Sequence, residues 1–177
     1  MGNAGANDDG SGVISMLAIA KELKDKKFKS TLRFVGFSGE EIGLVGSSKY
    51  VSEIKNKKEI IGNIQLEMMA TNSRKDGAFH IIDCDKNNSV FMSKHIMSSI
   101  ENLNIDLKKV PACTSRSDHG SFWKAGLPAI VISENFFGGD GDPCYHKSCD
   151  VLDDRIDFDY MAKITSSVAS AVEAILR

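Results

Sequence analysis

Acidic residues lie next to glycines at two places in the first quarter of the sequence. Residues 5–12 are GANDDGSG, in which Asp8 and Asp9 are adjacent in a glycine-rich turn before an apolar run. The segment FSGEEIGLVGS places Glu40 and Glu41 side by side in a second glycine-rich turn. Acidic side chains are common at helix N-termini, where they complement exposed backbone N–H groups. Each pair taken alone therefore also fits a solvated helix cap.

The rest of the chain predicts alternating helices and strands that would position these acids. Helical spacing of apolar residues predicts helices over residues 12–25, 43–54 and 89–103, and a last helix with Phe158, Met161, Ile164, Val168, Val172 and Ile175 on one stripe. Strands are expected over residues 30–37, 61–68, 78–83 and 127–133. This alternation predicts an α/β fold with a mostly parallel, twisted sheet covered by helices.

In such a fold the acids and one histidine should gather at one edge of the sheet. Ligands collect at the C-terminal ends of parallel strands, and each of these side chains follows a predicted strand or stands in the turn before the first helix. The residues so placed are Asp8, Glu40, Glu41, Glu67 and His146. Clustered carboxylates repel one another and raise each other's pKa, a penalty that a divalent cation removes. Carboxylates with an imidazole suit zinc or a similar ion.

The adjacent glutamates allow a division of labour. Because neighbouring side chains point in different directions, one of Glu40 and Glu41 can ligate the metal while the other faces the metal-activated water. That second carboxylate would serve as general base and later pass the proton to the leaving group. The metal would lower the pKa of the water towards ~7.

Length and charge narrow the class of protein. The 177 residues fit a single domain over 1–177, and 42% hydrophobic residues with 26% charged residues are typical of a globular chain. The net charge is −2 and there is no long basic run, so we expect no nucleic-acid partner. No apolar stretch reaches membrane-spanning length, so we expect no membrane association, and residues 1–12 lack a signal-peptide pattern.

The cysteines are Cys84, Cys113, Cys144 and Cys149. The last two flank a histidine in DPCYHKSCD and are close enough to close a small loop. Zinc binding by thiols would need further partners at suitable spacing, so a local disulfide or free thiols are the alternatives for this pair. A disulfide would indicate a secreted or periplasmic parent protein. The state of Cys84 and Cys113 stays open.

Taken together, the segments GANDDGSGV, FSGEEIGLVGS, RSDHGSFWKAGLPA and DPCYHKSCDVLDD resemble successive signatures of the M28 family of zinc aminopeptidases. They occur in the expected order and cover essentially the whole chain, and CYHKSCD most resembles the secreted bacterial branch. The resemblance implies a three-layer zinc-peptidase/phosphorylase-like sandwich. It also implies zinc, with two ions in the parent enzyme, and a secreted or periplasmic location.

The resemblance also implies residue roles. Asp8 would bridge two zinc ions, Glu41 and His146 would ligate one of them, and Glu67 the other. Glu40 would be the general base.

Further roles are implied around this set. Tyr145 would donate a hydrogen bond to the tetrahedral oxyanion, and Arg116 would contact substrate. The Asp8–Asp9 peptide bond would be cis, with Asp9 fixing the turn. Asp118 and Asp150 either hold the ligands through hydrogen bonds or are ordinary turn acids.

The sequence departs from the family pattern at two positions. Glu67, in QLEMM, stands where the family usually has aspartate, with the same ligand atoms on a longer stem. The family's first histidine ligand, in a His-x-Asp strand upstream of GANDDGSG, has no counterpart among the histidines here, which are His80, His95, His119 and His146. We therefore expect an N-terminally shortened fold, with one zinc site weakened.

The predicted function is a metallo-aminopeptidase that removes N-terminal residues from peptides with a free N-terminus, with Glu40 as general base. A glutaminyl-cyclase-like acyltransferase is an alternative, because those relatives use one zinc held by Asp, Glu and His. An inactive truncated domain is the second alternative.

Overall fold

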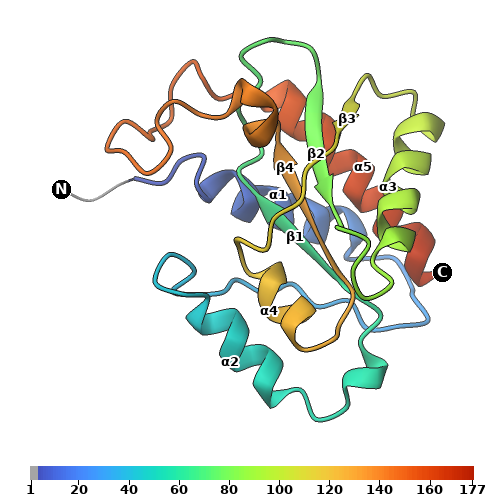
Figure 1. Ribbon diagram of the computed structural model, residues 1–177. Helices are drawn as coiled ribbons and strands as arrows, with labels where there is room; N and C mark the ends of the chain where they lie inside the picture. Colours follow the sequence, from blue (N-terminus) through green and yellow to red (C-terminus); the bar gives the residue numbers. More distant parts are fainter. Residues whose placement is uncertain (1–3) are drawn as a thin grey trace.

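The computed structural model describes residues 4–177, which form one mixed sheet with helices on both faces (Figure 1). The strands are β1 (Asn63–Glu67), β2 (Ala78–Ile82), β3 (Lys108–Val110) and β4 (Ala129–Glu134). The helices are α1 (Gly10–Leu23), α2 (Val45–Glu53), α3 (Val90–Asn102), α4 (His119–Lys124) and α5 (Phe158–Leu176), with short turns η1 (Lys57–Glu59) and η2 (Phe136–Asp140). The α/β prediction is confirmed.

The strand order is β1-β4-β2-β3. β1 runs parallel to β4 and β2 parallel to β3, while β2 and β4 are antiparallel, so the sheet is mixed. Glu67, the last residue of β1, stands beside Ser133 of β4. The carboxyl ends of β1 and β4 therefore lie at the same edge, as the site prediction requires.

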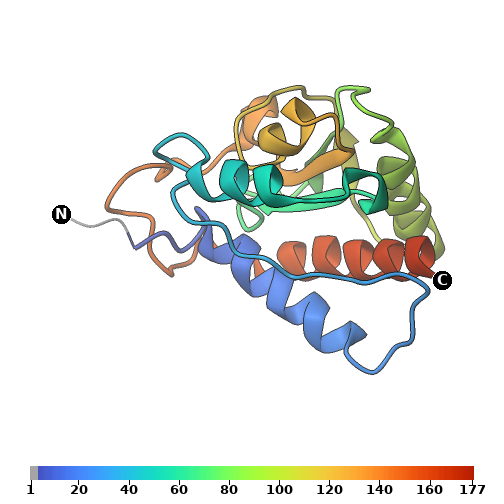
Figure 2. The ribbon, with the colours of Figure 1, turned by 90° about the horizontal axis from the view of Figure 1, so that it is seen from below.

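The two faces of the sheet carry separate cores, which makes three layers (Figure 2). Ile130 and Ile132 of β4 pack against α1, α3 and α5, whereas Ala129 and Val131 pack against α2 and α4. Successive strand side chains point to opposite faces, so this alternation follows from the strand geometry. Every residue of β4 is buried, as expected of a central strand covered on both sides.

Helix α5 covers one face with the predicted apolar stripe. Asp157 caps its N-terminus by accepting a hydrogen bond from the Tyr160 backbone N at 3.0 Å. Ile164 and Val168 are buried at 0% and 1% exposure. Phe158, the first residue of the helix, is 57% exposed, so its predicted place on the buried stripe is wrong.

The prediction of a strand over residues 30–37 is wrong. Residues 31–37 run without regular structure, and none of them makes a backbone–backbone hydrogen bond within residues 4–177. A cavity of about 1260 Å³ is lined by this segment and by β1, whose outer edge is unpaired in the described sheet. A strand forms only where a neighbouring backbone pairs with it. Within the described residues, the segment 31–37 has no such pairing despite its apolar pattern.

Two disulfides fix loops around the sheet. Cys144–Cys149 forms as one of the predicted alternatives, and Cys84–Cys113 joins the loop after β2 to the loop after β3. None of the helices among residues 4–177 has the length and apolar character needed to cross a bilayer.

Candidate metal centre

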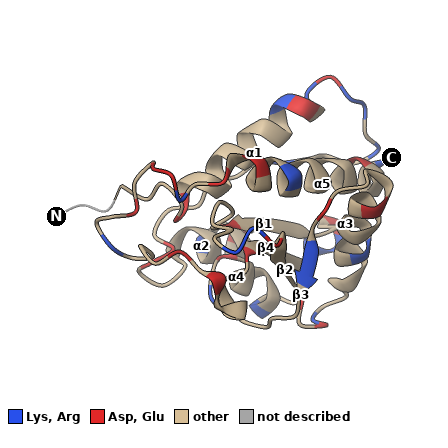
Figure 3. Ribbon diagram, turned by 90° about the horizontal axis from the view of Figure 1, so that it is seen from above, with Lys and Arg blue, Asp and Glu red and all other residues tan. Residues whose placement is uncertain are grey.

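Three side chains from distant segments meet at one end of the molecule. The Nε2 atom of His146 lies 3.3 Å from Asp8 Oδ2 and 2.9 Å from Glu41 Oε1. One ligand atom from each residue lies within 4.8 Å of the other two. Figure 3 shows acidic segments gathered at this end, beside the turn that precedes α1. His146 is 47% exposed and Glu41 57% exposed, so the group is open to solvent.

This donor set fits zinc. Catalytic zinc sites use three protein ligands from imidazole and carboxylate groups and keep a further position open. Burial, followed by the neighbouring Glu41 carboxylate, raises the pKa of Asp8 to about 6. A divalent cation between the carboxylates would offset this repulsion. Asp8, Glu41 and His146 could therefore hold one ion.

The Asp8 side chain is presented by a tightly held turn. The Asp8–Asp9 peptide bond is cis, as expected. Asp9 Oδ1 accepts from the backbone N of Gly12 at 3.2 Å and of Met68 at 3.0 Å, which ties the start of α1 to the end of β1. A Cβ at Gly12 would stand 2.6 Å from the Leu66 carbonyl oxygen, so only glycine fits this approach.

Asp150 holds the same turn from the other side. Its two carboxylate oxygens accept from the backbone N of Asn7 at 2.8 Å and of Asp8 at 3.0 Å. Asp150 is fully buried. Asp150 was predicted either to hold the ligands through hydrogen bonds or to be an ordinary turn acid. In the structure it binds the backbone of the turn that carries Asp8. Asp118 lines the cavity, and one of its buried carboxylate oxygens has no hydrogen-bond partner within residues 4–177.

Glu40 and Glu67 lie in the acidic wall of the cavity but outside the three-residue group. Burial, and then the adjacent Glu41, raises the pKa of Glu40. Burial raises the pKa of Glu67 to about 7, against a hydrogen bond from the Ser117 hydroxyl. Both carboxylates thus bind protons more strongly than exposed glutamates do.

Tyr145 lies beside the group, whereas Arg116 does not contact it. The Tyr145 ring stacks on His146 with centroids 3.7 Å apart. Burial, and then the Asp8 carboxylate, raises the pKa of the Tyr145 hydroxyl, which stays protonated and able to donate. Arg116 is exposed, and its backbone N donates to Thr114 Oγ1 at 3.1 Å. A substrate contact by Arg116 stays a prediction.

Two of the other histidines, His80 and His119, lie in the interior. His80 is buried, with Nδ1 2.9 Å from the Val110 carbonyl and Nε2 accepting from the Phe137 backbone N at 3.0 Å. His119 is buried against Trp123, and burial lowers its pKa to about 4. Among the histidines of the described chain, His146 alone joins the carboxylate group.

Sequence reasoning missed a buried polar network behind the site. Asn7 Nδ2 donates to Glu134 Oε2 at 2.9 Å, and the other Glu134 oxygen accepts from the Asp142 backbone N at 3.0 Å. Arg155 donates to Asp142 Oδ1 at 2.5 Å. Glu134 could have been found from the sequence, because it stands at the end of an apolar strand segment, as Glu67 does. No sequence pattern indicated a role for Arg155.

Comparison with known proteins agrees with this architecture. Residues 1–172 match the family described as Peptidase family M28. Aminopeptidase YwaD of Bacillus subtilis is 34% identical over 157 residues, covering 84% of this chain and 33% of the relative. Aminopeptidase Y of Saccharomyces cerevisiae is 30% identical over 183 residues, covering 95% of this chain and 33% of the relative.

Solved structures show the same fold. BSAP, a zinc aminopeptidase from Bacillus subtilis, superposes with a TM-score of 0.89 at 27% identity, covering 99% of this chain and 43% of that chain. The chain thus spans about a third of the length of the curated relatives it matches. With the family match over nearly all of its length, the chain belongs to peptidase family M28.

Proposed function

We propose that this chain carries the catalytic site of a zinc-dependent aminopeptidase, which removes N-terminal residues from peptides. The observation that carries the proposal is the convergence of Asp8, Glu41 and His146 within 4.8 Å of one another. Family membership and the aminopeptidase names of the relatives support the reaction class. They favour peptide hydrolysis over the cyclase-like acyltransferase reaction, because both curated relatives described above are named as aminopeptidases.

Asp8, Glu41 and His146 would hold one zinc ion, and Asp8 with Glu67 would hold a second ion more weakly, since fewer ligands are available there. When bound, zinc supplies Lewis-acid polarisation of the scissile carbonyl and a water whose pKa is lowered towards ~7. The acidic groups around the second ion, Asp8 and Glu67, would attract the substrate's free α-ammonium group.

Glu40 would act as the general base. It lines the same cavity as Asp8 and Glu41, and its raised pKa brings it closer to the operating pH of a base that later returns its proton. In the reaction, Glu40 would take a proton from the attacking water and deliver it to the leaving amine. The Tyr145 hydroxyl would donate a hydrogen bond to the oxygen that becomes negative at the tetrahedral stage.

We also infer a secreted or periplasmic location for the protein to which the chain belongs. The two disulfides, Cys84–Cys113 and Cys144–Cys149, support this inference, because such bonds persist in oxidising compartments.

The test measures zinc content and catalysis on the same preparation. The chain is loaded with zinc, dialysed and assayed on aminoacyl-nitroanilides, on peptide amides and on glutaminyl peptides for ring closure. Bound zinc with release of N-terminal residues supports the proposal. Ring closure without amide hydrolysis would favour the acyltransferase, and absence of zinc and of both activities would favour an inactive domain.

A further inference from the structure

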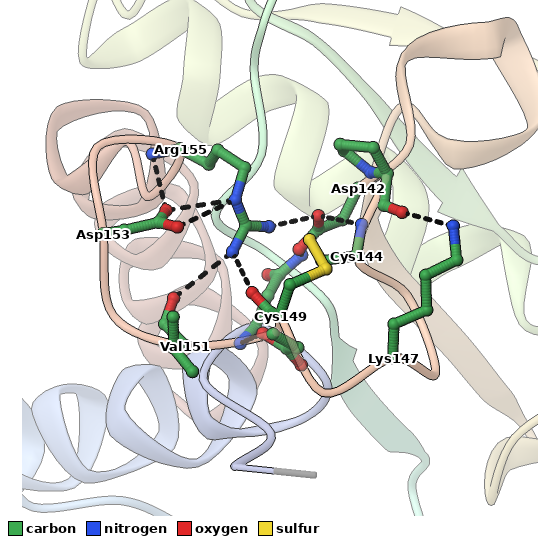
Figure 4. The surroundings of a disulfide bond; sticks show 10 residues. Asp142, Cys144, Lys147, Cys149, Val151, Asp153 and Arg155 are labelled. Atoms are coloured by element: carbon green, nitrogen blue, oxygen red, sulfur yellow. Dashed lines mark hydrogen bonds and ion pairs between the residues drawn. A yellow bond between two sulfur atoms is a disulfide. The ribbon is translucent and has the colours of Figure 1, made fainter.

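The loop between η2 and α5 contains Tyr145 and His146. Arg155 contacts residues on both sides of this pair, Asp142 before it and Cys149 and Val151 after it (Figure 4). The Arg155 guanidinium donates through Nη1 to Asp142 Oδ1 at 2.5 Å. Through Nη2 it donates to the carbonyl oxygens of Cys149 at 2.6 Å and Val151 at 3.4 Å. One side chain therefore joins the beginning of the loop to the segment that follows the histidine.

Asp142 connects this arginine to the turn that carries Asp8. Its side chain is 0% exposed, and Oδ1 also accepts from the Cys144 backbone N at 2.7 Å. The other oxygen, Oδ2, accepts from Asn7 Nδ2 at 3.3 Å, and Asn7 immediately precedes Asp8. A buried carboxylate is costly without a cation, so Arg155 is the partner that permits Asp142 to occupy this position.

Within residues 4–177, few contacts hold the His146 ring. Its contacts are Asp8, Glu41 and the stacked Tyr145 ring, all of which belong to the proposed site. The backbone of His146 has a φ of 57°, in the left-handed region that non-glycine residues rarely adopt. The direction of the ring therefore depends on how firmly the surrounding loop is fixed.

We propose that Arg155 is a positioning residue for the proposed zinc site, because it fixes the loop that directs His146 towards Asp8 and Glu41. This inference rests on the proposed function only through the identity of the metal. The planar fork of arginine is required, since a single lysine ammonium cannot reach Asp142 and both carbonyl oxygens in the same geometry. The Cys144–Cys149 disulfide closes the same loop but does not join Asp142 to Val151, as Arg155 does.

The first experiment compares zinc affinities by competition with a chromogenic chelator. Arg155→Ala should weaken zinc binding by about 10–100-fold, the range typical of residues that orient ligands. Arg155→Lys should fold more readily than Arg155→Ala. Its zinc affinity should lie between that of Arg155→Ala and that of the unmodified chain. Arg74→Ala is the matched control, because Arg74 donates to the Gly138 and Gly139 carbonyl oxygens of the neighbouring η2 segment. It should leave zinc affinity unchanged.

The second experiment needs neither zinc nor activity. Lys147 is exposed at the tip of the loop, so trypsin cleavage after Lys147 in metal-free protein reports how often the loop opens. Arg155→Ala should accelerate this cleavage by about tenfold or more, while Arg74→Ala should not. Unchanged zinc affinity and unchanged cleavage in Arg155→Ala would overturn the inference. An unmodified chain that binds zinc without hydrolysing peptides would instead contradict only the proposed reaction.

Discussion

Glu40 is the residue at which metal binding and proton transfer can be separated. It lines the cavity beside Asp8 and Glu41 but lies outside the group formed by Asp8, Glu41 and His146. Glu40→Gln should therefore lower kcat for an aminoacyl-nitroanilide by about 10²–10⁴-fold, because the amide cannot accept a proton. Zinc content, measured by atomic absorption, should stay the same.

Glu22→Gln provides the control for this experiment. Glu22 is an exposed glutamate near the end of α1 that forms an ion pair with Lys26, and it does not line the cavity. It should retain full activity and zinc content. A Glu40→Gln variant as active as the unmodified chain would exclude Glu40 as the base, whatever the metal content.

Glu134 should govern part of the pH dependence of stability. Burial raises its pKa from 4.5 to about 7, while the unfolded chain titrates near 4.5. Folding thus favours the protonated form, and the contribution of Glu134 to the free energy of unfolding is largest below pH 4.5. This contribution should fall by about 3 kcal/mol between pH 4.5 and pH 7 and then level off.

The measurement is urea unfolding of metal-free protein across this pH range. Glu134→Gln should have a shallower pH dependence than the unmodified chain between pH 4.5 and 7. Glu101→Gln, an exposed position on α3, should keep the original slope. Parallel curves for Glu134→Gln and the unmodified chain would show that Glu134 is ionised throughout.

The candidate ligands could be predicted from the sequence, whereas the residues that hold their loops in place could not. Asp8, Glu41 and His146 stand in short motifs next to glycines or cysteines, and alternation of elements placed them at one sheet edge. Arg155 and Glu134 act through contacts with Asp142 and Asn7. Such contacts depend on how the loops pack, and no local pattern encodes that packing.

At the scale of elements, a single substitution can test the apolar packing of helix α5. Ile164 is 0% exposed in the core beneath the sheet, so Ile164→Ala should lower the free energy of unfolding by about 2–5 kcal/mol. Phe158→Ala, on the same helix at an exposed position, should change it by about 0.5 kcal/mol or less. Urea titration followed by circular dichroism measures both. Equal losses would contradict the assignment of the buried face.

The elements that sequence predicted well are those with a clear apolar pattern. β4 follows from the apolar, β-branched segment LPAIVIS, and α5 from its long stripe. β3 was missed because Lys108–Val110 is short and carries two lysines. Residues 31–37 have a strand-like composition, but pairing depends on a neighbouring edge, which a local pattern does not report.

For the molecule as a whole, the two edges of the sheet differ in their protection. β3 presents exposed Lys108 and Lys109, which discourage edge-to-edge pairing (Figure 3). β1 has the sequence NIQLE, without lysine or arginine, and its outer edge faces the cavity beside residues 31–37. We therefore expect the isolated chain to self-associate through β1.

Gln65→Lys tests this expectation by adding a lysine to the unprotected edge. In sedimentation velocity over a concentration series, association should shift to higher concentration in this variant. Ser98→Lys adds the same charge at an exposed position on α3 and should associate like the unmodified chain. Equal shifts in both variants would indicate a net-charge effect, and a strictly monomeric unmodified chain would contradict self-association altogether.

The separation of the three proposed ligands along the chain affects when the site can exist. Asp8 and Glu41 leave the ribosome well before His146 does. A nascent chain that ends before His146 offers oxygen ligands without the imidazole and without the loop that Arg155 fastens. Capture of zinc at this site would then require translation past His146, and a product terminated before His146 would be recognisable by its failure to retain the ion.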